Sequence, residues 1–263
     1  MDQPHDPSWR SSLASRAARH VADWVDLQLV HVVTSLERLA PRARGRLLDV
    51  GCGDKPYEHI FAPHVREYIG VEHEATFDAT SASTRGKADV RYDGRTLPFP
   101  DESFDTVLSV QVLEHTPRPD TLLAEMARVL RHDGILILSA PFSFRLHEEP
   151  HDYFRFTPHG LRELCDRAGL VIDELQPHGS LGSLIGHKVN SYLALRVARI
   201  AGVAQALGKL GHEARSELGP RIWTLPVVAP AMIAVAAGAR VLDRVLPDPT
   251  ETLGYTLAAR PRR

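Results

Sequence analysis

Short apolar runs rich in leucine, isoleucine and valine recur along the chain and alternate with amphipathic or polar stretches. Runs of this kind are typical of buried strands in a parallel sheet. They predict strands at residues 47–50, 67–72, 88–92, 104–110, 135–139 and 170–175, and a seventh at residues 253–258. Helical spacing between the strands predicts helices at residues 57–61, 120–130 and 161–168.

The alternation of strands and helices predicts an α/β fold with a parallel sheet and right-handed crossover connections. Residues 1–44 precede the sheet and are expected to be an N-terminal helical segment, apart from a disordered lead. The sheet domain is expected to cover residues 45–178. Residues 251–263 would supply the last strand and a basic tail.

A helical insertion is predicted at residues 179–250, between the sixth and seventh strands. Residues 222–239 are nearly free of charge and approach the ~18 apolar residues of a membrane span. Pro226 and Pro230 interrupt this stretch, and much of it is alanine, which is only mildly apolar. We expect a subdomain that covers the substrate or pairs two subunits as a homodimer. The alternative is peripheral contact of residues 181–245 with a membrane.

The composition is that of an ordinary globular protein, with 43% hydrophobic and 24% charged residues among 263. A net charge of −2 gives no sign of nucleic-acid binding. The two cysteines make no disulfide framework, and the polar N-terminus does not resemble a signal peptide. These features predict a cytoplasmic protein.

The glycine turn after the first strand is the strongest chemical signal. Gly51 and Gly53 lack a Cβ, so the backbone can turn sharply and a ligand can approach it closely. Asp49, just before the turn, can accept hydrogen bonds from an ammonium group or a bound water. This carboxylate would repel a pyrophosphate, and the third glycine of the dinucleotide fingerprint is missing.

Two further acids end strands at the same edge of the predicted sheet. Glu72 ends the second strand, where a carboxylate can accept two ribose hydroxyls, and Asp93 closes the third, where it could receive an amino group from a base. Each acid alone could equally be a solvated strand end. Leu97, Phe99 and Leu113 offer apolar surface for a flat ring. Together these residues describe a cationic ligand that carries a ribose and an adenine.

The order of these motifs resembles the class I S-adenosylmethionine-dependent methyltransferases. The likeness is specific because several separate stretches match in sequence order between about residues 45 and 140. The matching stretches are residues 48–53, 68–72, 93–99, 103–107, 112–115 and 130–136.

The resemblance implies S-adenosyl-L-methionine as the cofactor and a Rossmann-like, seven-stranded methyltransferase sheet. It also implies that Gly51 and Gly53 pass under the methionine part of the cofactor. Glu72 would then hold the ribose, and Asp93 would meet the adenine.

Cys52, Gly94 and Gln111 lie within or beside the matching stretches and complete the candidate cofactor-binding set. The chain departs from many family members at Lys55, where they have a third glycine. This departure concerns the end of the loop and not the identity of the cofactor. We expect Lys55 to point to water rather than to pair with an acid.

Residues 142–156 follow the fifth strand and are rich in aromatic and histidine side chains, so they should overhang the site on the acceptor side. A histidine partnered by an acid can remove a proton from a hydroxyl. His151, with Asp152 next to it, is the first candidate for this base, followed by His147 and His115. The run HDYFRFTP resembles the corresponding segment of bacterial methyltransferases linked to cell-surface sugars and natural products.

The segment His147–His151 also matches the zinc-protease string His-Glu-x-x-His. That motif requires both histidines on one face of a continuous helix. Pro150 would interrupt such a helix, so we interpret the match as chance and predict no metal site from it.

The sequence therefore predicts methyl transfer from S-adenosylmethionine to a small-molecule or saccharide acceptor, with oxygen as the preferred acceptor atom. Transfer to nitrogen or carbon stays open. Two other classes of function remain: a subunit that binds the cofactor without catalysis, and a membrane-associated interaction protein. A nicotinamide-dependent dehydrogenase is the competing enzyme for this fold.

Overall fold

The computed structural model describes residues 24–74, 88–200, 229–248 and 250–262. Predictions that fall on residues 1–23, 75–87 or 201–228 lie outside these described residues. The chain divides into two compact units. The sheet unit comprises residues 31–178 and 252–263, and the helical unit comprises residues 1–30 and 179–251.

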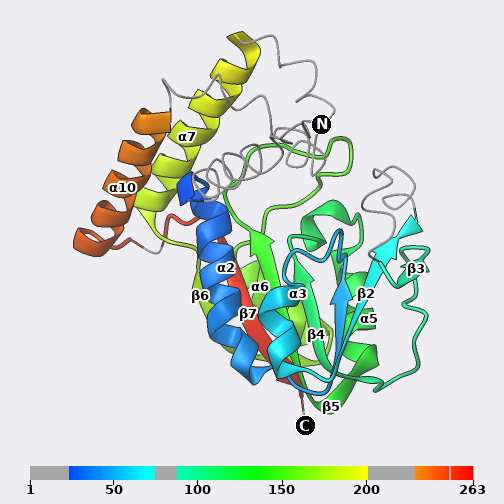
Figure 1. Cartoon of the computed structure of the whole chain (residues 1–263). Helices are drawn as coiled ribbons and strands as arrows, with labels where there is room; N and C mark the ends of the chain where they lie inside the picture. Colours follow the sequence, from blue (N-terminus) through cyan, green and yellow to red (C-terminus); the bar gives the residue numbers. More distant parts are fainter. Residues whose placement is uncertain (1–23, 75–87, 201–228, 249, 263) are drawn as a thin grey trace, which may run out of the picture. The chain divides into compact units, whose positions relative to one another are not determined.

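The seven predicted strands are present and form one sheet in the order β3-β2-β1-β4-β5-β7-β6 (Figure 1). The pairings among the first five strands are parallel, whereas β7 runs antiparallel to both β5 and β6. The strands are β1 Arg46–Val50, β2 Glu67–His73, β3 Val90–Tyr92, β4 Phe104–Val110, β5 Leu130–Pro141, β6 Leu170–Pro177 and β7 Gly254–Pro261.

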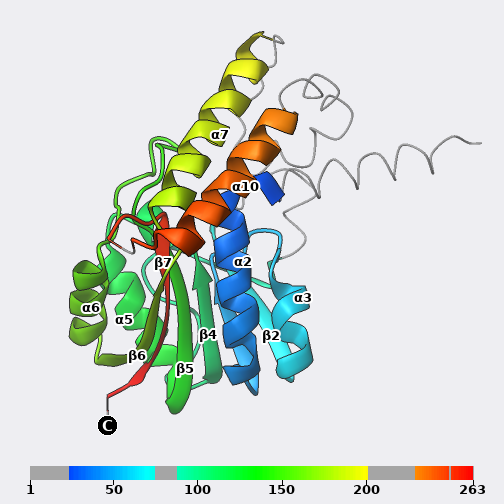
Figure 2. The ribbon, with the colours of Figure 1, turned by 90° about the vertical axis from the view of Figure 1, so that its left-hand side faces the viewer.

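Helices cover both faces of this sheet (Figure 2). Leu47 and Leu48 are neighbours in β1 and point to opposite faces, as strand geometry requires. Leu47 packs in the core under α2 and α3, and Leu48 packs in the core under α5 and α6. The helices of the sheet unit are α2 Leu27–Leu39, which begins in the helical unit, α3 Glu58–Phe61, α5 Pro119–Val129 and α6 Pro158–Arg167, with short 3-10 turns η1 Ala40–Arg42, η2 Ala62–His64 and η3 Leu113–His115.

The fifth strand begins earlier than its apolar run indicates. Phe104 pairs with Leu130, and the next pair is Thr106 with Ile135, so the residues between Leu130 and Ile135 form an irregular bulge. This bulge is part of β5, which therefore follows α5 without an intervening turn. Exposed polar residues inside a strand give no apolar signal, which is why the sequence placed the start at Ile135.

The helical unit contains α7 Leu181–Ile200 and α10 Ala229–Val245, which lie side by side (Figure 1). Asp243 of α10 accepts hydrogen bonds from the hydroxyls of Ser180 and Ser183, at 2.5 Å each. A Cβ on Gly186 would stand 2.6 Å from the Cβ of Ala239, so the two helices pack at very close range. Among the residues that the structure describes, no helix has the length and apolar character needed to cross a membrane.

Asp49 is buried between β1 and β2 and is only 2% exposed. Its Oδ2 atom accepts a hydrogen bond of 2.6 Å from the hydroxyl of Tyr68, on the neighbouring strand. Burial raises the pKa of the Asp49 carboxyl to about 7, although the Tyr68 hydrogen bond opposes this shift. The carboxylate therefore fixes the β1–β2 pairing directly before the glycine turn, and it does so at a cost when it is ionised.

Helix α6 begins immediately after residues 142–156 and is capped by the side chain of the residue that precedes it. The Thr157 hydroxyl accepts a hydrogen bond of 3.0 Å from the backbone N–H of Gly160, and Pro158 occupies the first helical position. Both features favour a helix start at this point.

Removing the Thr157 cap should destabilise the sheet unit. We expect Thr157→Ala to lower the free energy of unfolding by about 1 kcal/mol, because one orphan backbone N–H loses its acceptor. Thr157→Ser keeps the hydroxyl and should retain most of the stability. Urea denaturation of the three proteins makes the comparison, and equal midpoints for wild type and Thr157→Ala would contradict the capping role.

The buried Asp49 carboxyl should make stability depend on pH. Its folded-state pKa lies above the ordinary value, so the folded protein holds a proton that the unfolded chain has already lost. The stability contributed by this group therefore falls as pH rises between about 4 and 7. Relative to Asp49→Asn, wild type should lose up to about 4 kcal/mol between pH 4 and pH 8.

The matched control for this titration is Asp93, whose exposed carboxylate accepts hydrogen bonds from the backbone N–H groups of Arg95 and Thr96. These bonds lower the pKa of Asp93, so Asp93→Asn should produce a trend of opposite sign, confined to acid pH. Thermal melts across the pH range measure both pairs. A pH-independent difference between wild type and Asp49→Asn would rule out the buried titration.

Candidate functional site

The glycine turn lies at the carboxyl end of β1 and is held against β2. The backbone N–H groups of Gly51 and Cys52 donate to the carbonyl of Val71, at 2.9 and 3.2 Å. Gly51 and Gly53 both have positive φ angles, 73° and 51°. A Cβ on Gly51 would also stand 2.5 Å from the side chain of Val112, so any larger residue would meet both strain and a collision.

Glu72 faces this turn from the end of β2. One carboxylate oxygen accepts from the N–H of Gly53 at 2.8 Å, and the other accepts from the N–H of His73 at 2.9 Å. Burial raises the pKa of Glu72, and the two backbone hydrogen bonds oppose that shift. Because a carboxylate offers about four acceptor positions, each oxygen can accept a further hydrogen bond. Glu72 therefore links the turn to β2 and can still bind two hydroxyls of a ligand.

The third predicted acid, Asp93, directly follows β3. The pKa of the Tyr92 hydroxyl, at the end of β3, is raised to about 12, by burial first and then by the charges of Glu72 and Asp93. Gly94 has a φ of 77°, and a Cβ there would stand 2.5 Å from the ring of His73, so the turn packs closely against β2.

Cys52 and Gln111, the other two side chains of the candidate cofactor-binding set, differ in their surroundings. The Cys52 side chain is 3% exposed, and burial raises the pKa of its thiol well above the usual range. Gln111 lies directly after β4 with a φ of 57°, and its amide donates to the hydroxyl of Ser139 at 3.0 Å. A strained residue at the end of a strand is a common feature of ligand sites.

Two apolar expectations need correction. Leu97 and Leu113 are each 1% exposed and belong to the core on the α5 and α6 side of the sheet. The prediction that they offer surface to a flat ring is therefore wrong. Phe99 is only partly buried and packs edge-on against Phe104, so it is the one of the three with accessible surface.

The prediction that Lys55 points to water is also wrong. Its Nζ atom lies 2.6 Å from a carboxylate oxygen of Asp89, and the side chain is only 10% exposed. The same Asp89 oxygen accepts from the backbone N–H of Gly70 in β2. Lys55 therefore ties the end of the glycine loop to the segment before β3.

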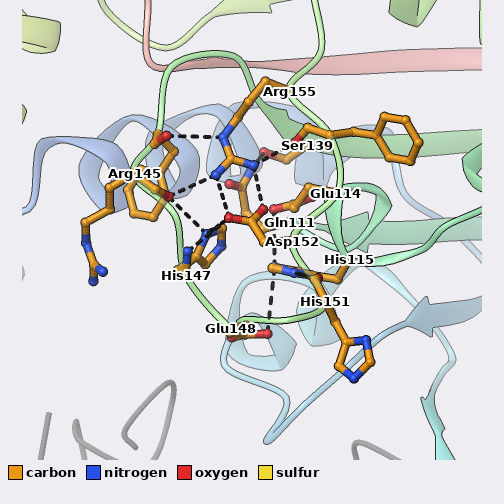
Figure 3. A network of polar contacts seen from close by, with 12 residues as sticks. Gln111, Glu114, His115, Ser139, Arg145, His147, Glu148, His151, Asp152 and Arg155 are labelled. Atoms are coloured by element: carbon orange, nitrogen blue, oxygen red, sulfur yellow. Dashed lines mark hydrogen bonds and ion pairs between the residues drawn. The ribbon is translucent and has the colours of Figure 1, made fainter. Parts of the chain in front are cut away.

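The acceptor-side loop, residues 142–156, is organised by Asp152 (Figure 3). Two guanidinium nitrogens of Arg155 lie 2.6 and 2.8 Å from its two carboxylate oxygens, and the backbone N–H of His147 donates to it at 2.9 Å. The Arg155 pair is the main reason that the pKa of Asp152 lies well below its usual range. Residues 147–151 form no helix, so the two histidines of the zinc-protease string do not share a helix face.

The acid partner expected for His151 is wrong. Asp152 accepts from the Nδ1 atom of His147, at 3.2 Å, and His151 has its Nδ1 atom 3.0 Å from the Tyr153 hydroxyl. Adjacent residues in this extended loop point in different directions, so neighbours in sequence need not be partners in space. His115 joins the same region because its Nδ1 atom lies 2.8 Å from the carbonyl of His151.

Glu114 is a polar residue of this region that the sequence did not single out. It follows β4 in η3, is fully buried, and its backbone carbonyl accepts from the N–H of Tyr153 at 2.8 Å. Burial raises the pKa of its carboxyl to about 8, although the charge of Arg155 opposes the shift. Burial, together with the neighbouring His115, also lowers the pKa of His147. The available signal was an acid placed directly between an apolar run and a histidine.

Comparison with known proteins agrees with this geometry. Residues 48–138 match the model of the methyltransferase domain family. A Mycobacterium marinum protein named "Uncharacterized methyltransferase" is 38% identical over 141 residues, which is 52% of this chain and 52% of that protein. A Mycobacterium tuberculosis protein named "Probable S-adenosylmethionine-dependent methyltransferase" is 36% identical over 107 residues, 40% of this chain and 39% of that protein.

The solved structure of a SAM-dependent methyltransferase from Archaeoglobus fulgidus shares the fold, with a TM-score of 0.50 and 18% identity over 87% of this chain and 92% of that chain. The chain spans about half or less of the length of the curated relatives it matches. The match covers β1 to β5, which carry the glycine turn and the strand-end acids. Residues 48–138 therefore match a methyltransferase domain, and the relatives of this chain include one named as S-adenosylmethionine-dependent.

Proposed function

We propose that the protein transfers a methyl group from S-adenosylmethionine to an oxygen atom of a small-molecule or saccharide-like acceptor. The observation that carries the proposal is the close approach of Glu72 to the bare backbone of the glycine turn, beside a loop that gathers histidines. The matched domain family supports the cofactor and the reaction class. The class of acceptor and its reacting atom are our inference.

The residues at the strand ends suit the chemical groups of this cofactor. Glu72 has free acceptor positions for two ribose hydroxyls, and its negative charge favours a cationic sulfonium. Gly51 and Gly53 leave room for the methionine part where a Cβ would strain the turn. Asp93 is exposed and uses one carboxylate oxygen within its own turn, so its second oxygen remains the candidate partner of the adenine amino group.

When bound, S-adenosylmethionine supplies a methyl group that is already activated on sulfur. The protein therefore has to orient the acceptor oxygen in line with that carbon and exclude water. As the new C–O bond forms and the S–C bond breaks, the hydroxyl proton must leave. His151 is our candidate for receiving it, with Tyr153 rather than Asp152 as the group that orients its ring.

His147 and His115 are the other candidate bases in the loop region, and both are more enclosed than His151. An oxygen acceptor is preferred because amines and activated carbons need less help in losing a proton than an aliphatic hydroxyl does. The proposal also includes contact of residues 181–245 with a membrane or with a second copy of the chain.

Disrupting the glycine turn should abolish cofactor binding. We expect Gly51→Val to give no calorimetric heat with S-adenosylmethionine or S-adenosylhomocysteine, because the new side chain would meet Val112 in a strained backbone. Glu72→Ala should weaken binding by about 1–3 kcal/mol, through lost hydrogen bonds to a charged group.

The control for this experiment is Gly238→Ala, in α10, where a Cβ meets no atom within 4 Å. This variant should bind like wild type. An affinity for Gly51→Val equal to that of wild type, in a protein that melts normally, would refute the site. Heat with NAD and none with S-adenosylmethionine would favour a dehydrogenase.

Removing the candidate base should lower turnover and leave cofactor affinity unchanged. We expect His151→Ala to reduce S-adenosylhomocysteine release by roughly 100-fold or more in a screen of monosaccharide, phenolic and aliphatic hydroxyl acceptors. His159→Ala, an exposed histidine on α6, serves as the control. An unchanged rate for His151→Ala would exclude it as the base, and product found only with amines would exclude oxygen as the acceptor.

A further inference from the structure

Three side chains with metal-binding atoms meet between η3 and the acceptor-side loop (Figure 3). Glu114 and His115 come from η3, and His147 comes from the loop after β5. One potential ligand atom from each of the three lies within 4.8 Å of the others. The rings of His115 and His147 stand edge to face, with centroids 4.6 Å apart.

The Glu114 carboxylate is buried without compensation. The residue is 0% exposed, and neither carboxylate oxygen has a hydrogen-bond partner among the residues that the structure describes. The Nε2 atom of His115 lies 3.8 Å from one of its oxygens, which is beyond hydrogen-bond distance. Buried carboxylates in folded proteins are normally hydrogen-bonded, paired or bound to a metal, so Glu114 requires a positive partner when it is ionised.

Both histidines are held through the same ring nitrogen, Nδ1. The Nδ1 atom of His115 lies 2.8 Å from the carbonyl of His151. The Nδ1 atom of His147 lies 3.2 Å from the carbonyl of Arg145 and 3.2 Å from Asp152. Carbonyls and ionised carboxylates only accept, so Nδ1 carries the hydrogen on both rings and each Nε2 keeps a lone pair in the neutral form.

This second layer of contacts is the one that metal-binding histidines typically have. A histidine that ligates through one nitrogen usually donates the other N–H to a carboxylate or a backbone carbonyl, which fixes the tautomer and the ring orientation. Here Asp152 and two backbone carbonyls fill that role, and Arg155 in turn holds Asp152.

A fourth group lies close enough to complete the set. A carboxylate oxygen of Glu148 is 3.7 Å from His115 Nε2, and its side chain is 40% exposed. Ligands bonded at 2.0–2.2 Å in a tetrahedron stand about 3.4 Å apart, so the three potential ligand atoms, now within 4.8 Å of one another, would close by up to about 1.4 Å on binding a metal.

We propose that Glu114, His115 and His147 form a binding site for a divalent first-row transition-metal ion, with Glu148 as an exchangeable fourth ligand. Two imidazoles and a carboxylate favour zinc and its neighbours in that row over magnesium or calcium, which prefer oxygen ligands alone. The site differs from the zinc-protease string, because His151 contributes only its carbonyl and Glu114 comes from another segment.

Zinc titration of the full chain, without cofactor or acceptor, tests the proposal independently of methyl transfer. A competing chromophoric chelator should report one tight Zn²⁺ site per chain, and excess Mg²⁺ should not displace the metal. Co²⁺ in its place should give visible absorption bands typical of four or five ligands that include nitrogen.

The chain has 14 histidines in all, so variants are needed to separate this site from the histidines outside it. We expect Glu114→Gln and His147→Asn each to weaken zinc binding by at least roughly 100-fold, because loss of a ligand should exceed the 10–100-fold effect of second-layer changes. His159→Ala should leave the affinity unchanged, and thermal melts verify that all variants are folded.

The competing interpretation is a proton on His115 Nε2 that pairs with Glu114 and Glu148 and leaves no place for a metal. Under that interpretation zinc would bind wild type no more tightly than Glu114→Gln, and that result would overturn the proposal. Retention of the tight site in folded His147→Asn would overturn it as well.

Discussion

Burial of carboxylates at one edge of the sheet is the constraint on which the rest of this structure depends. Asp49, Glu72 and Glu114 belong to or follow β1, β2 and β4, which are adjacent in the sheet, and burial raises the pKa of all three. A buried carboxylate costs free energy unless donors or cations surround it. The three carboxylates differ in how far they meet this requirement, and the difference corresponds to the proposed role of each.

Asp49 is satisfied by the Tyr68 hydroxyl and holds β1 to β2, so its contribution is structural as well as electrostatic. Glu72 is satisfied by two backbone N–H groups and retains acceptor capacity toward a ligand. Glu114 has no such partner among the described residues. Along the sheet edge, the hydrogen-bonded Asp49 of β1 therefore lies between Glu72 of β2, which can accept from a ligand, and Glu114 after β4, which has no such partner.

Much of the sheet unit could be predicted because its signals are local. Apolar runs, the glycines of the turn and the acids at strand ends each lie within a few residues, and parallel pairing then brings them to one edge. What failed depended on side-chain direction. The partner of Asp152 is His147 rather than its neighbour His151, and Lys55 reaches Asp89 across the loop. A leucine suits the core as well as an apolar ligand surface, so the sequence alone could not show which of these roles Leu97 and Leu113 have. Glu114 was missed because the pattern of apolar residues predicts which hydrophobic side chains are buried and does not predict the burial of an acid.

The antiparallel position of β7 has a consequence for synthesis of the chain. This strand lies between β5 and β6, yet it follows residues 179–251 in sequence. Because β7 supplies the hydrogen-bonding neighbour of both β5 and β6, neither has its final partner until residues 254–261 have left the ribosome. The nascent protein therefore carries two open strand edges while residues 178–253 are translated. That interval is when a chaperone would have most to protect.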